Sequence, residues 1–599
     1  MKIAFQNFSA WDDRPHAESE LARRLVKAAA ALRGVDAIAS SSCEEISAFS
    51  PDIVIPLHFF VPKLFDAFTI GCMWNPVYAI ARNDCWDNLK SYDGYGVASP
   101  QQEQFVRALK FKSPCPYLLS VLYPSANATH FVPVEDFNDP VYIGANWDGQ
   151  RQDQLSKLAR NVQVYGPADR WKNLPGALYR GEIPFDGTSS LSVYRNAGIG
   201  LSFHHPQHLA EGLPCMRPFE IAASGALMIS DQNPFVKEHF GDAVLYLDHQ
   251  ADPQQFADQL EAHLAWAGEN KRQAIEMARE AHEIFTARFS LEVLLENLLH
   301  EVAEFQARED TQTAAPEHPG VEIIVRTDNS RTEPLIRALQ SIERQTYENV
   351  TACIVFFGPA HALSDLKNII AQACPSLRFH CISTQEGADR STNFYTGLRS
   401  CRAPFFGFLD DDDVLFRDHV ETLIGCLARY PERVLAYSGS VRIWDDNDVP
   451  PGESMIRLGY FHDIDGFSSK SFITSNSYLI RRNKIPWHLL EQPRPDMQKS
   501  EDFLFLKLLY HHVQTFIFSE KVTCGFYWSA RNQGNTVFAE TKYIKELDLV
   551  SIARKTAGTQ MSYAVSTKPK ESPPSRSRAA AGLKRIWSGI RNHVPGITL

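Results

Sequence analysis

The chain has 599 residues, of which 44% are hydrophobic and 22% are charged, a composition typical of a globular protein with several domains. Its formal net charge of −11 argues against a general nucleic-acid binder, because such proteins present a basic face. It contains no run of about 18 apolar residues that would predict a membrane-spanning helix. Its first residues are not typical of a secretory signal, and its eleven cysteines form no C-x-x-C pair. We therefore expect a cytoplasmic protein with reduced thiols and no zinc site.

Strand-like apolar runs alternate with helical patterns along the chain, which predicts an α/β architecture. In the first unit we expect strands at KIAF and PDIVIPLHF, with a helix near residues 18–32 between them. The second unit opens with the strand VYIG, followed by a helix near residues 152–159. VQVYG, IGLSF and ALMISD indicate further strands, and a long charged helical pattern over residues 253–305 closes the unit.

The segment EGLPCMRPFEIAASGALMISD carries the chemistry of the second unit. It predicts a helix over residues 214–224, with Gly225 as its C-terminal stop. The free N–H groups at such a helix start favour an anion, and Arg217 in the first turn is suited to a phosphate. Glu220, one turn later, could accept hydrogen bonds from ribose hydroxyls. The alternative is a surface helix on which both side chains are merely solvated.

Residues 307–320 are polar, contain two prolines and have no periodicity, which predicts a linker to a third unit. That unit starts with the strand VEIIVRT and a helix from Glu333. The segment GADRSTNFYTGL then supplies a glycine turn, Arg390 and Asn393.

The sharpest signal of the third unit is FFGFLDDDD, in which an apolar strand leads into Asp410 and three further aspartates. Adjacent carboxylates cannot be buried unpaired, and at the carboxyl end of an α/β strand they suit Mg²⁺ or Mn²⁺ bridging to a diphosphate. The alternative is a solvated acidic turn. Glu501 and Asp502 are predicted at a helix start, where the helix dipole alone favours acids. The functional interpretation is a general base acting on an acceptor hydroxyl.

In order and spacing, residues 321–530 resemble a family-2 glycosyltransferase of the GT-A fold. The resemblance rests on the VEIIVRT start with its Asn and Arg, on QTY at residues 345–347, on the glycine-to-asparagine segment, on FLDDDD and on the Glu–Asp pair. It implies a nucleotide-sugar donor, a divalent metal and inversion at the anomeric carbon. It also implies Asp502 as the catalytic base, supported by Glu501.

The resemblance further assigns the metal and the diphosphate to Asp410, Asp412 and Asp413, and the donor to Thr327, Asn329, Arg390, Asn393 and Asp411. One departure is visible. Where the family has V-D-D-G-S after the second strand, this chain has Val355, Phe356, Phe357, Gly358 and Pro359, without a carboxylate. Recognition of the nucleotide base must therefore differ, either by stacking on Phe357 or through weaker donor binding.

The first two units together, about residues 1–303, resemble a GT-B glycosyltransferase. RPFEIAASGALMISD is similar to the donor-binding element of the family-4-like and spore-maturation-like group. The resemblance implies ribose binding by Glu220, diphosphate contacts from Arg217 and the backbone of Gly212 and Leu213, and a cleft-facing loop with Asn146 and Arg151. One departure is that the family-4 glutamates are separated by seven residues, whereas Glu211 and Glu220 are separated by eight. This puts a catalytic-site role of Glu211 in doubt or implies a bulge.

The end of the chain differs from the rest in charge. From Lys568 onward seven basic residues and one acid give +6, which leaves −17 for residues 1–567. Four apolar residues fall on one helical face at i, i+3, i+4 and i+7: Leu583, Ile586, Trp587 and Ile590. Such a basic amphipathic helix suits an anionic membrane surface. The alternatives are docking to a partner protein and a frayed terminus.

These features predict a bifunctional glycosyltransferase that extends a growing glycan, by analogy in bacterial surface polysaccharide such as O-antigen or capsule. One alternative is a single active, metal-dependent, inverting GT-A module with a degenerate GT-B module that binds or positions the acceptor. Another is a non-catalytic glycan-binding scaffold. The expected partners are nucleotide sugars, a glycan or lipid-linked glycan acceptor and, through the tail, the inner face of the cytoplasmic membrane, but no nucleic acid.

The predicted boundaries are residues 1–135 for the GT-B N-terminal Rossmann-like domain, 136–306 for its donor-binding domain, 307–320 for a linker, 321–555 for the GT-A domain, 556–578 for a disordered linker and 579–599 for the basic amphipathic tail.

Overall fold

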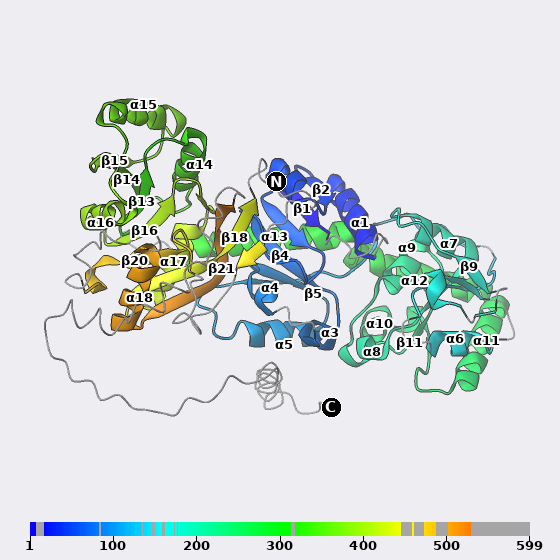
Figure 1. Cartoon of the computed structure of the whole chain (residues 1–599). Helices are drawn as coiled ribbons and strands as arrows, with labels where there is room; N and C mark the ends of the chain where they lie inside the picture. The colour runs from blue at the N-terminus through cyan, green and yellow to red at the C-terminus, as the bar shows by residue number, and fades with distance from the viewer. Residues whose placement is uncertain are drawn as a thin grey trace, which may run out of the picture.

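The computed structural model describes residues 1–7, 17–82, 86–134, 136–146, 150–158, 162–172, 174–175, 178–312, 318–444, 458–460, 473–486 and 501–528. Within these ranges the chain forms three sheets with helices packed against them (Figure 1). The first two sheets are parallel and Rossmann-like, and the third is mixed, so the α/β fold class predicted from the sequence is confirmed. The predicted C-terminal amphipathic helix lies outside the described residues.

The first sheet has the strand order β2-β1-β3-β4-β5-β6, and all its strands are parallel. Helix α1 buries one apolar face on it, at the i, i+4 and i+7 spacing of Leu21, Leu25 and Ala28. The strands are β1 (Lys2–Gln6), β2 (Asp36–Ser40), β3 (Ile53–Pro56), β4 (Phe68–Met73), β5 (Gly94–Val97) and β6 (Leu118–Val121). The helices are α1 (Ala17–Ala31), α2 (Cys43–Phe49), α3 (Val77–Arg82), α4 (Trp86–Lys90) and α5 (Pro100–Leu109).

The second sheet has the order β12-β11-β10-β7-β8-β9, again all parallel. The strand order reverses between β7 and β10, and ligands of such sheets bind at the carboxyl ends beside this switch point. The strands are β7 (Val141–Ile143), β8 (Gln163–Tyr165), β9 (Tyr179–Gly181), β10 (Ile199–Ser202), β11 (Leu227–Asp231) and β12 (Leu245–Leu247). The helices are α6 (Gln150–Leu155), α7 (Ser189–Ala197), α8 (Pro206–Glu211), α9 (Met216–Ser224), α10 (Pro234–Phe240), α11 (Pro253–Glu269) and α12 (Lys271–Arg288).

The long helical pattern that follows the second sheet forms three helices, and the last of them, α13 (Leu291–Gln312), returns to the first sheet. Leu295 and Leu298 of α13 are buried in one cluster with Ile3 and Leu25. Most of α13 falls in the range predicted for the donor-binding domain, residues 136–306, yet it packs on the first unit, and it continues into the expected linker. The domain boundaries themselves remain a prediction.

The third sheet has the order β15-β14-β13-β16-β20-β18-β21-β17, with β19 beside β18. Its first four strands are parallel, and β20 joins β16 antiparallel. The strands are β13 (Val321–Thr327), β14 (Val350–Phe356), β15 (Phe379–Ser383), β16 (Phe405–Asp410), β17 (Val414–Leu415), β18 (Leu435–Trp444), β19 (Leu458–Tyr460), β20 (Tyr478–Arg481) and β21 (Phe516–Trp528). The helices are α14 (Thr332–Glu343), α15 (Leu363–Ala373), α16 (Arg390–Ser400), α17 (His419–Arg429) and α18 (Glu501–Val513).

The first unit lies between the other two and is packed against both (Figure 1). On the side of the third unit, one apolar cluster includes Val54 and Phe65 together with Phe406. Around it, Asp66 accepts a hydrogen bond of 2.8 Å from the backbone N–H of Arg417. Among the described helices, none is both long and apolar enough to cross a membrane.

Candidate active site

The carboxyl ends of β13 and β16 lie side by side, because these strands are parallel neighbours with Arg326 opposite Asp410. Strand β16 is buried through Leu409 and ends at Asp410, the first of the four aspartates. One edge of the sheet therefore carries an arginine and a run of carboxylates, at the position where α/β sheets bind ligands.

Arg326 connects this edge to helix α18. Its guanidinium group is buried and donates to Asp410 at 2.8 Å and to Glu501 at 2.5 Å. Arg390, at the start of α16, adds a contact of 3.3 Å to Glu501. The carboxylates of β16 and the first turn of α18 thus meet at one place, although 90 residues lie between Asp410 and Glu501. The sequence places Arg326 at the carboxyl end of an apolar strand but assigns it no role. The signal was available, because a buried arginine at the end of an apolar strand needs carboxylate partners.

The remaining aspartates each have a hydrogen-bond donor. Arg331 contacts Asp411 at 2.5 Å and Asp412 at 2.6 Å. The Thr327 hydroxyl also donates to Asp411, at 2.9 Å. Asp413 is buried and accepts from the backbone N–H of Tyr527 at 3.0 Å. These donors explain how four adjacent acids are accommodated at the end of a buried strand.

The acids at this edge differ in proton affinity. Burial would raise the pKa of Asp410, but Arg326 and Arg390 lower it to about 2. Burial raises the pKa of Asp411 to about 6. Burial, with the negative charges of Glu501 and Asp410, raises the pKa of Asp502 to about 6. A carboxylate with this pKa can accept a proton near neutral pH.

The other residues expected at the nucleotide take different positions. Asn329 has a left-handed backbone (φ 61°), and its N–H donates to the Thr327 hydroxyl at 3.0 Å, so it lies in the turn after β13. Asn393 is buried; its amide oxygen accepts from the Thr384 hydroxyl at 2.7 Å, and its amide nitrogen donates to a backbone carbonyl. Neither of these partners belongs to the aspartate run. Beside this turn, the N–H of Phe357 donates to the carbonyl of Thr327 at 3.1 Å, which places the segment without a carboxylate at the same edge.

The carboxylates at this edge would supply only some of the ligands of a hard divalent cation, and the substrate phosphates would supply others. Among the described residues, no three His, Cys, Asp or Glu side chains converge as a metal site would require. The oxygen chemistry of Asp410 and Asp412 nevertheless fits Mg²⁺ or Mn²⁺, since Mg²⁺ is usually held by one or two carboxylates together with substrate phosphates. Arg331 would have to release Asp412 for such binding.

In the second unit, Arg217 fills the switch point between β7 and β10. Its guanidinium group donates to the carbonyl of Ile143 at 3.2 Å and to that of Phe203, and it lies 5.3 Å from the ring centre of Tyr142. Arg151 donates to Gln154 at 2.6 Å and to the His204 carbonyl. The site expected for a diphosphate is therefore occupied by the protein's own contacts.

The other backbone groups expected at the diphosphate are also engaged. The N–H of Gly212 donates to Leu209 at 3.3 Å, and that of Leu213 donates to His208 at 2.9 Å, where they close α8. Asn146 donates to a backbone carbonyl at 3.4 Å. A cavity of about 270 Å³ adjoins this region and is lined in part by Arg151, His204 and His249.

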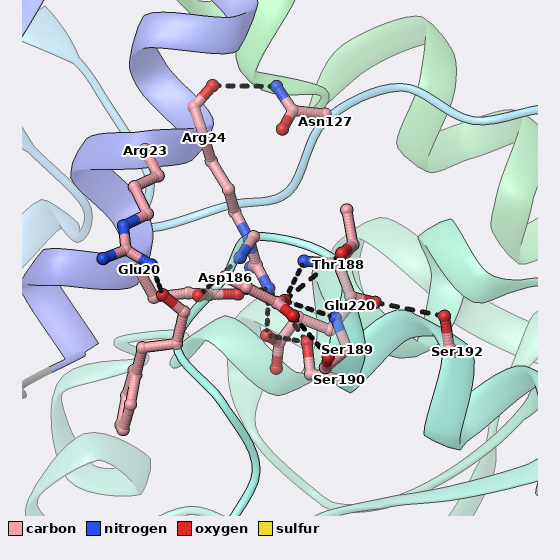
Figure 2. A network of polar contacts seen from close by, with 12 residues as sticks. Glu20, Arg23, Arg24, Asn127, Asp186, Thr188, Ser189, Ser190, Ser192 and Glu220 are labelled. Atoms are coloured by element: carbon pink, nitrogen blue, oxygen red, sulfur yellow. Dashed lines mark hydrogen bonds and ion pairs between the residues drawn. The ribbon is translucent and has the colours of Figure 1, made fainter.

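Glu220 does not face an open cleft but joins the first two units (Figure 2). It accepts from Arg24 of α1 at 2.8 Å and from the Ser190 hydroxyl at 3.0 Å. Arg24 also binds Glu20, at 2.7 Å. Glu211 is engaged likewise, since it accepts from the backbone N–H of Val77 in the first unit at 2.8 Å.

Comparisons with known proteins find two family matches in the chain. Residues 151–300 match the family described as glycosyl transferase-like, and residues 322–490 match glycosyl transferase family 2. A search of curated proteins finds no match. Among solved structures, the chain is similar to S. aureus TarS 1-349 at 13% identity and a TM-score of 0.28, over 40% of this chain and 67% of that one.

Two further TarS structures show similar values. The complex of TarS 1-349 with UDP-GlcNAc aligns at 14% identity and a TM-score of 0.27, over 35% of this chain and 58% of that one. TarS itself aligns at 13% identity and a TM-score of 0.26, over 35% of this chain and 37% of that one. From the two family matches, the chain is a glycosyltransferase in which a glycosyl transferase-like GT-B module is followed by a family-2 GT-A module.

Proposed function

We propose that the family-2 module transfers a glycosyl group from a nucleotide sugar to a hydroxyl of a glycan or lipid-linked glycan, with inversion at the anomeric carbon. The observation that carries this proposal is the Arg326 bridge, which joins Asp410 at the end of β16 to Glu501 at the start of α18. It brings the donor-side carboxylates and the proposed base, Asp502, to one edge of the sheet. Mass spectrometry of products from a panel of nucleotide sugars tests the proposal and identifies the donor.

The proposed reaction is a single displacement. Asp502 accepts the proton of the acceptor hydroxyl while that oxygen attacks the anomeric carbon, and the bond from this carbon to the diphosphate oxygen breaks. Glu501 supports the base indirectly, because it holds Arg326 and Arg390 in place. Thr327, Asn329 and neighbouring groups of the β13 turn would bind the nucleotide.

A divalent cation is the proposed cofactor of this module. Mg²⁺ or Mn²⁺ held by Asp410 and Asp412 would offset the charge of the leaving diphosphate. Asp413 would support the turn, since its carboxylate holds the backbone of Tyr527. The oxygen ligands and their place at the strand end support this assignment.

The metal assignment predicts that EDTA abolishes transfer and that added Mg²⁺ or Mn²⁺ restores it. Asp412→Asn removes one anionic ligand, so the metal concentration for half-maximal activity should rise by about 10–100-fold, the scale of a lost ligand-supporting group. Titration of activity against metal measures this shift. Asp365→Asn, an exposed acid in the first turn of α15, is the matched control and should leave the titration unchanged. Full activity in EDTA would contradict the assignment.

For the first two units, the geometry favours the single-active-module hypothesis over bifunctional transfer. Glu220, Glu211 and Arg217, which a donor would need, are bound to other parts of the chain. We propose that these units bind or position the acceptor for the family-2 module. The proposed setting, by analogy with paired transferases, is synthesis of a bacterial surface polysaccharide such as O-antigen or capsule.

The basic tail, which lies outside the described residues, is proposed to bind an anionic membrane surface through Trp587 and its apolar neighbours. In a liposome flotation assay with anionic lipid, the full chain should float and a protein that ends at Ser566 should stay at the bottom. Neutral liposomes serve as the control, because they lack the charge that attracts the +6 tail. Equal flotation of both proteins would remove the proposal.

A further inference from the structure

Cys215 occupies an unusual position in the second unit. It is the residue before the first turn of α9, with extended backbone (φ −99°, ψ −176°), and its side chain makes no capping hydrogen bond. The residue is partly exposed. The start of a helix lowers the pKa of a thiol, because the helix dipole favours the thiolate. The proposed glycosyl transfer does not use this side chain.

The start of α9 lies beside a buried histidine–aspartate pair, because Arg217 in its first turn donates to the carbonyl of Phe203, the residue before His204. β10 and β11 are parallel neighbours, so His204, just after β10, meets Asp231 at the end of β11. The two side chains contact each other at 2.7 Å, between Nδ1 and Oδ1. Both residues are almost fully buried, with 1% and 0% exposure. The other ring nitrogen of His204, Nε2, is buried without a hydrogen-bond partner in the described part of the chain.

The charges near Cys215 favour its thiolate form. Burial would raise the pKa of Cys215, but Arg217 and His204 lower it to about 7. For His204, burial lowers the pKa, but Cys215 and Asp231 outweigh it and raise the pKa to about 9. The order of thiol, imidazole and orienting carboxylate is that of an activated cysteine nucleophile.

We propose that Cys215 is a reactive thiolate and a modification site of the second unit, whose reactants are small soft electrophiles, in particular hydroperoxides. In this reaction the thiolate sulfur attacks one peroxide oxygen and the O–O bond breaks. The sulfur is oxidised to a sulfenic acid and the peroxide is reduced. The second oxygen leaves as hydroxide, which takes a proton from the His204 imidazolium and becomes water.

Other thiols of the chain provide internal comparison. Cys381 is also partly exposed, but burial raises its pKa. The positive charge of Lys367 lowers this pKa by less than burial raises it. Cys72 is buried, and its pKa lies well above the ordinary value. Of these three, only Cys215 is expected to be substantially ionised at neutral pH.

The test uses the full-length, reduced protein and brief treatment with iodoacetamide at pH 7, followed by peptide mass spectrometry. Cys215 should be alkylated about tenfold faster than Cys381, since its larger thiolate fraction outweighs its lower intrinsic nucleophilicity. In urea the two rates should become equal, because the folded arrangement is lost. After treatment with hydrogen peroxide, dimedone should label Cys215 and not Cys381. Equal alkylation rates in the native protein, or no dimedone adduct on Cys215, would overturn the proposal.

Variants test the role of the imidazole. His204→Gln should slow alkylation of Cys215 at pH 7 and move its pH midpoint upward. His205→Gln, a change at the exposed neighbouring histidine, should leave both unchanged. An unchanged midpoint in His204→Gln would contradict the proposed pairing. The wild-type comparison of native and urea-unfolded protein stays decisive if His204→Gln does not fold.

The charged and titratable groups around this site are Arg151, Arg217, His204, His205, His208, Asp231, Tyr142, Tyr194 and Glu220.

Discussion

Asp502→Asn is expected to lower the rate of glycosyl transfer by about 10²–10⁴-fold while the protein remains folded. The amide has nearly the same shape as the carboxylate but cannot accept the proton of an acceptor hydroxyl. General-base catalysis contributes about 10²–10⁴-fold in rate, so the transfer rate of the variant should fall by that factor. Initial rates of product formation, measured by mass spectrometry with the best donor of the panel, check this prediction.

The same group sets the expected pH dependence of the wild-type enzyme. Burial and the charges of Glu501 and Asp410 raise the pKa of Asp502 to about 6. Only the deprotonated form accepts a proton. We therefore expect kcat/KM to be at its maximum well above pH 6 and to fall as the pH drops through about 6. The residual activity of Asp502→Asn should lack this fall.

The control for Asp502→Asn is again Asp365→Asn, which changes an aspartate at the same place of a helix in the same unit. It should keep wild-type activity. If Asp502→Asn kept wild-type activity, the assignment of the base would be wrong. If it lost one transfer but still added a second kind of sugar, the first two units would contain a second active site, and the bifunctional hypothesis would stand. Loss of every transfer supports the single-active-module proposal.

The sequence predicted well those parts of the fold that local pattern determines. β13 and β16 are continuous apolar runs, as expected for strands covered on both faces, and both are present with the expected residues. Because parallel strands end at one edge, the position of the Asp410 run at that edge also followed from the sequence. The helix before Gly225 was predicted as well, and Gly225 ends it with a left-handed backbone (φ 78°).

The long-range partners of charged side chains could not be predicted in this way. Arg326 and Glu501 are 175 residues apart, and no local pattern pairs them. The same holds for Glu220, whose partner Arg24 lies 196 residues earlier in the chain. Both arginines are buried, so each requires carboxylates, but only the folded arrangement determines which ones. The return of α13 to the first sheet is a further long-range feature of this kind.

Arg24→Met is expected to destabilise the protein by about 3–5 kcal/mol, the cost of breaking a buried ion pair by removal of one partner. The side chain of Arg24 is fully buried and donates to Glu20 and Glu220, so its loss leaves two buried carboxylates close together without a cation (Figure 2). Urea unfolding of the purified variant measures the loss. The pairing joins α1 of the first unit to α9 of the second, so the contact between the units should weaken with it.

The pH dependence and two further variants separate this charge effect from a packing effect. Burial already raises the pKa of Glu20, and Arg24 counteracts it, so in Arg24→Met this pKa should rise further. A carboxyl group with a raised folded-state pKa lowers the free energy of unfolding as the pH rises. The stability deficit of Arg24→Met should therefore shrink as the pH falls toward the ordinary pKa of 4.5.

The double variant Arg24→Met with Glu220→Gln should lose less stability than Arg24→Met alone, since one unpaired charge is removed. Arg23→Met, at the exposed neighbouring position, removes a hydrogen bond to the Phe185 carbonyl and should change stability by about 1 kcal/mol or less. A deficit that is equal at all pH values would show that lost packing, not an uncompensated charge, explains the effect.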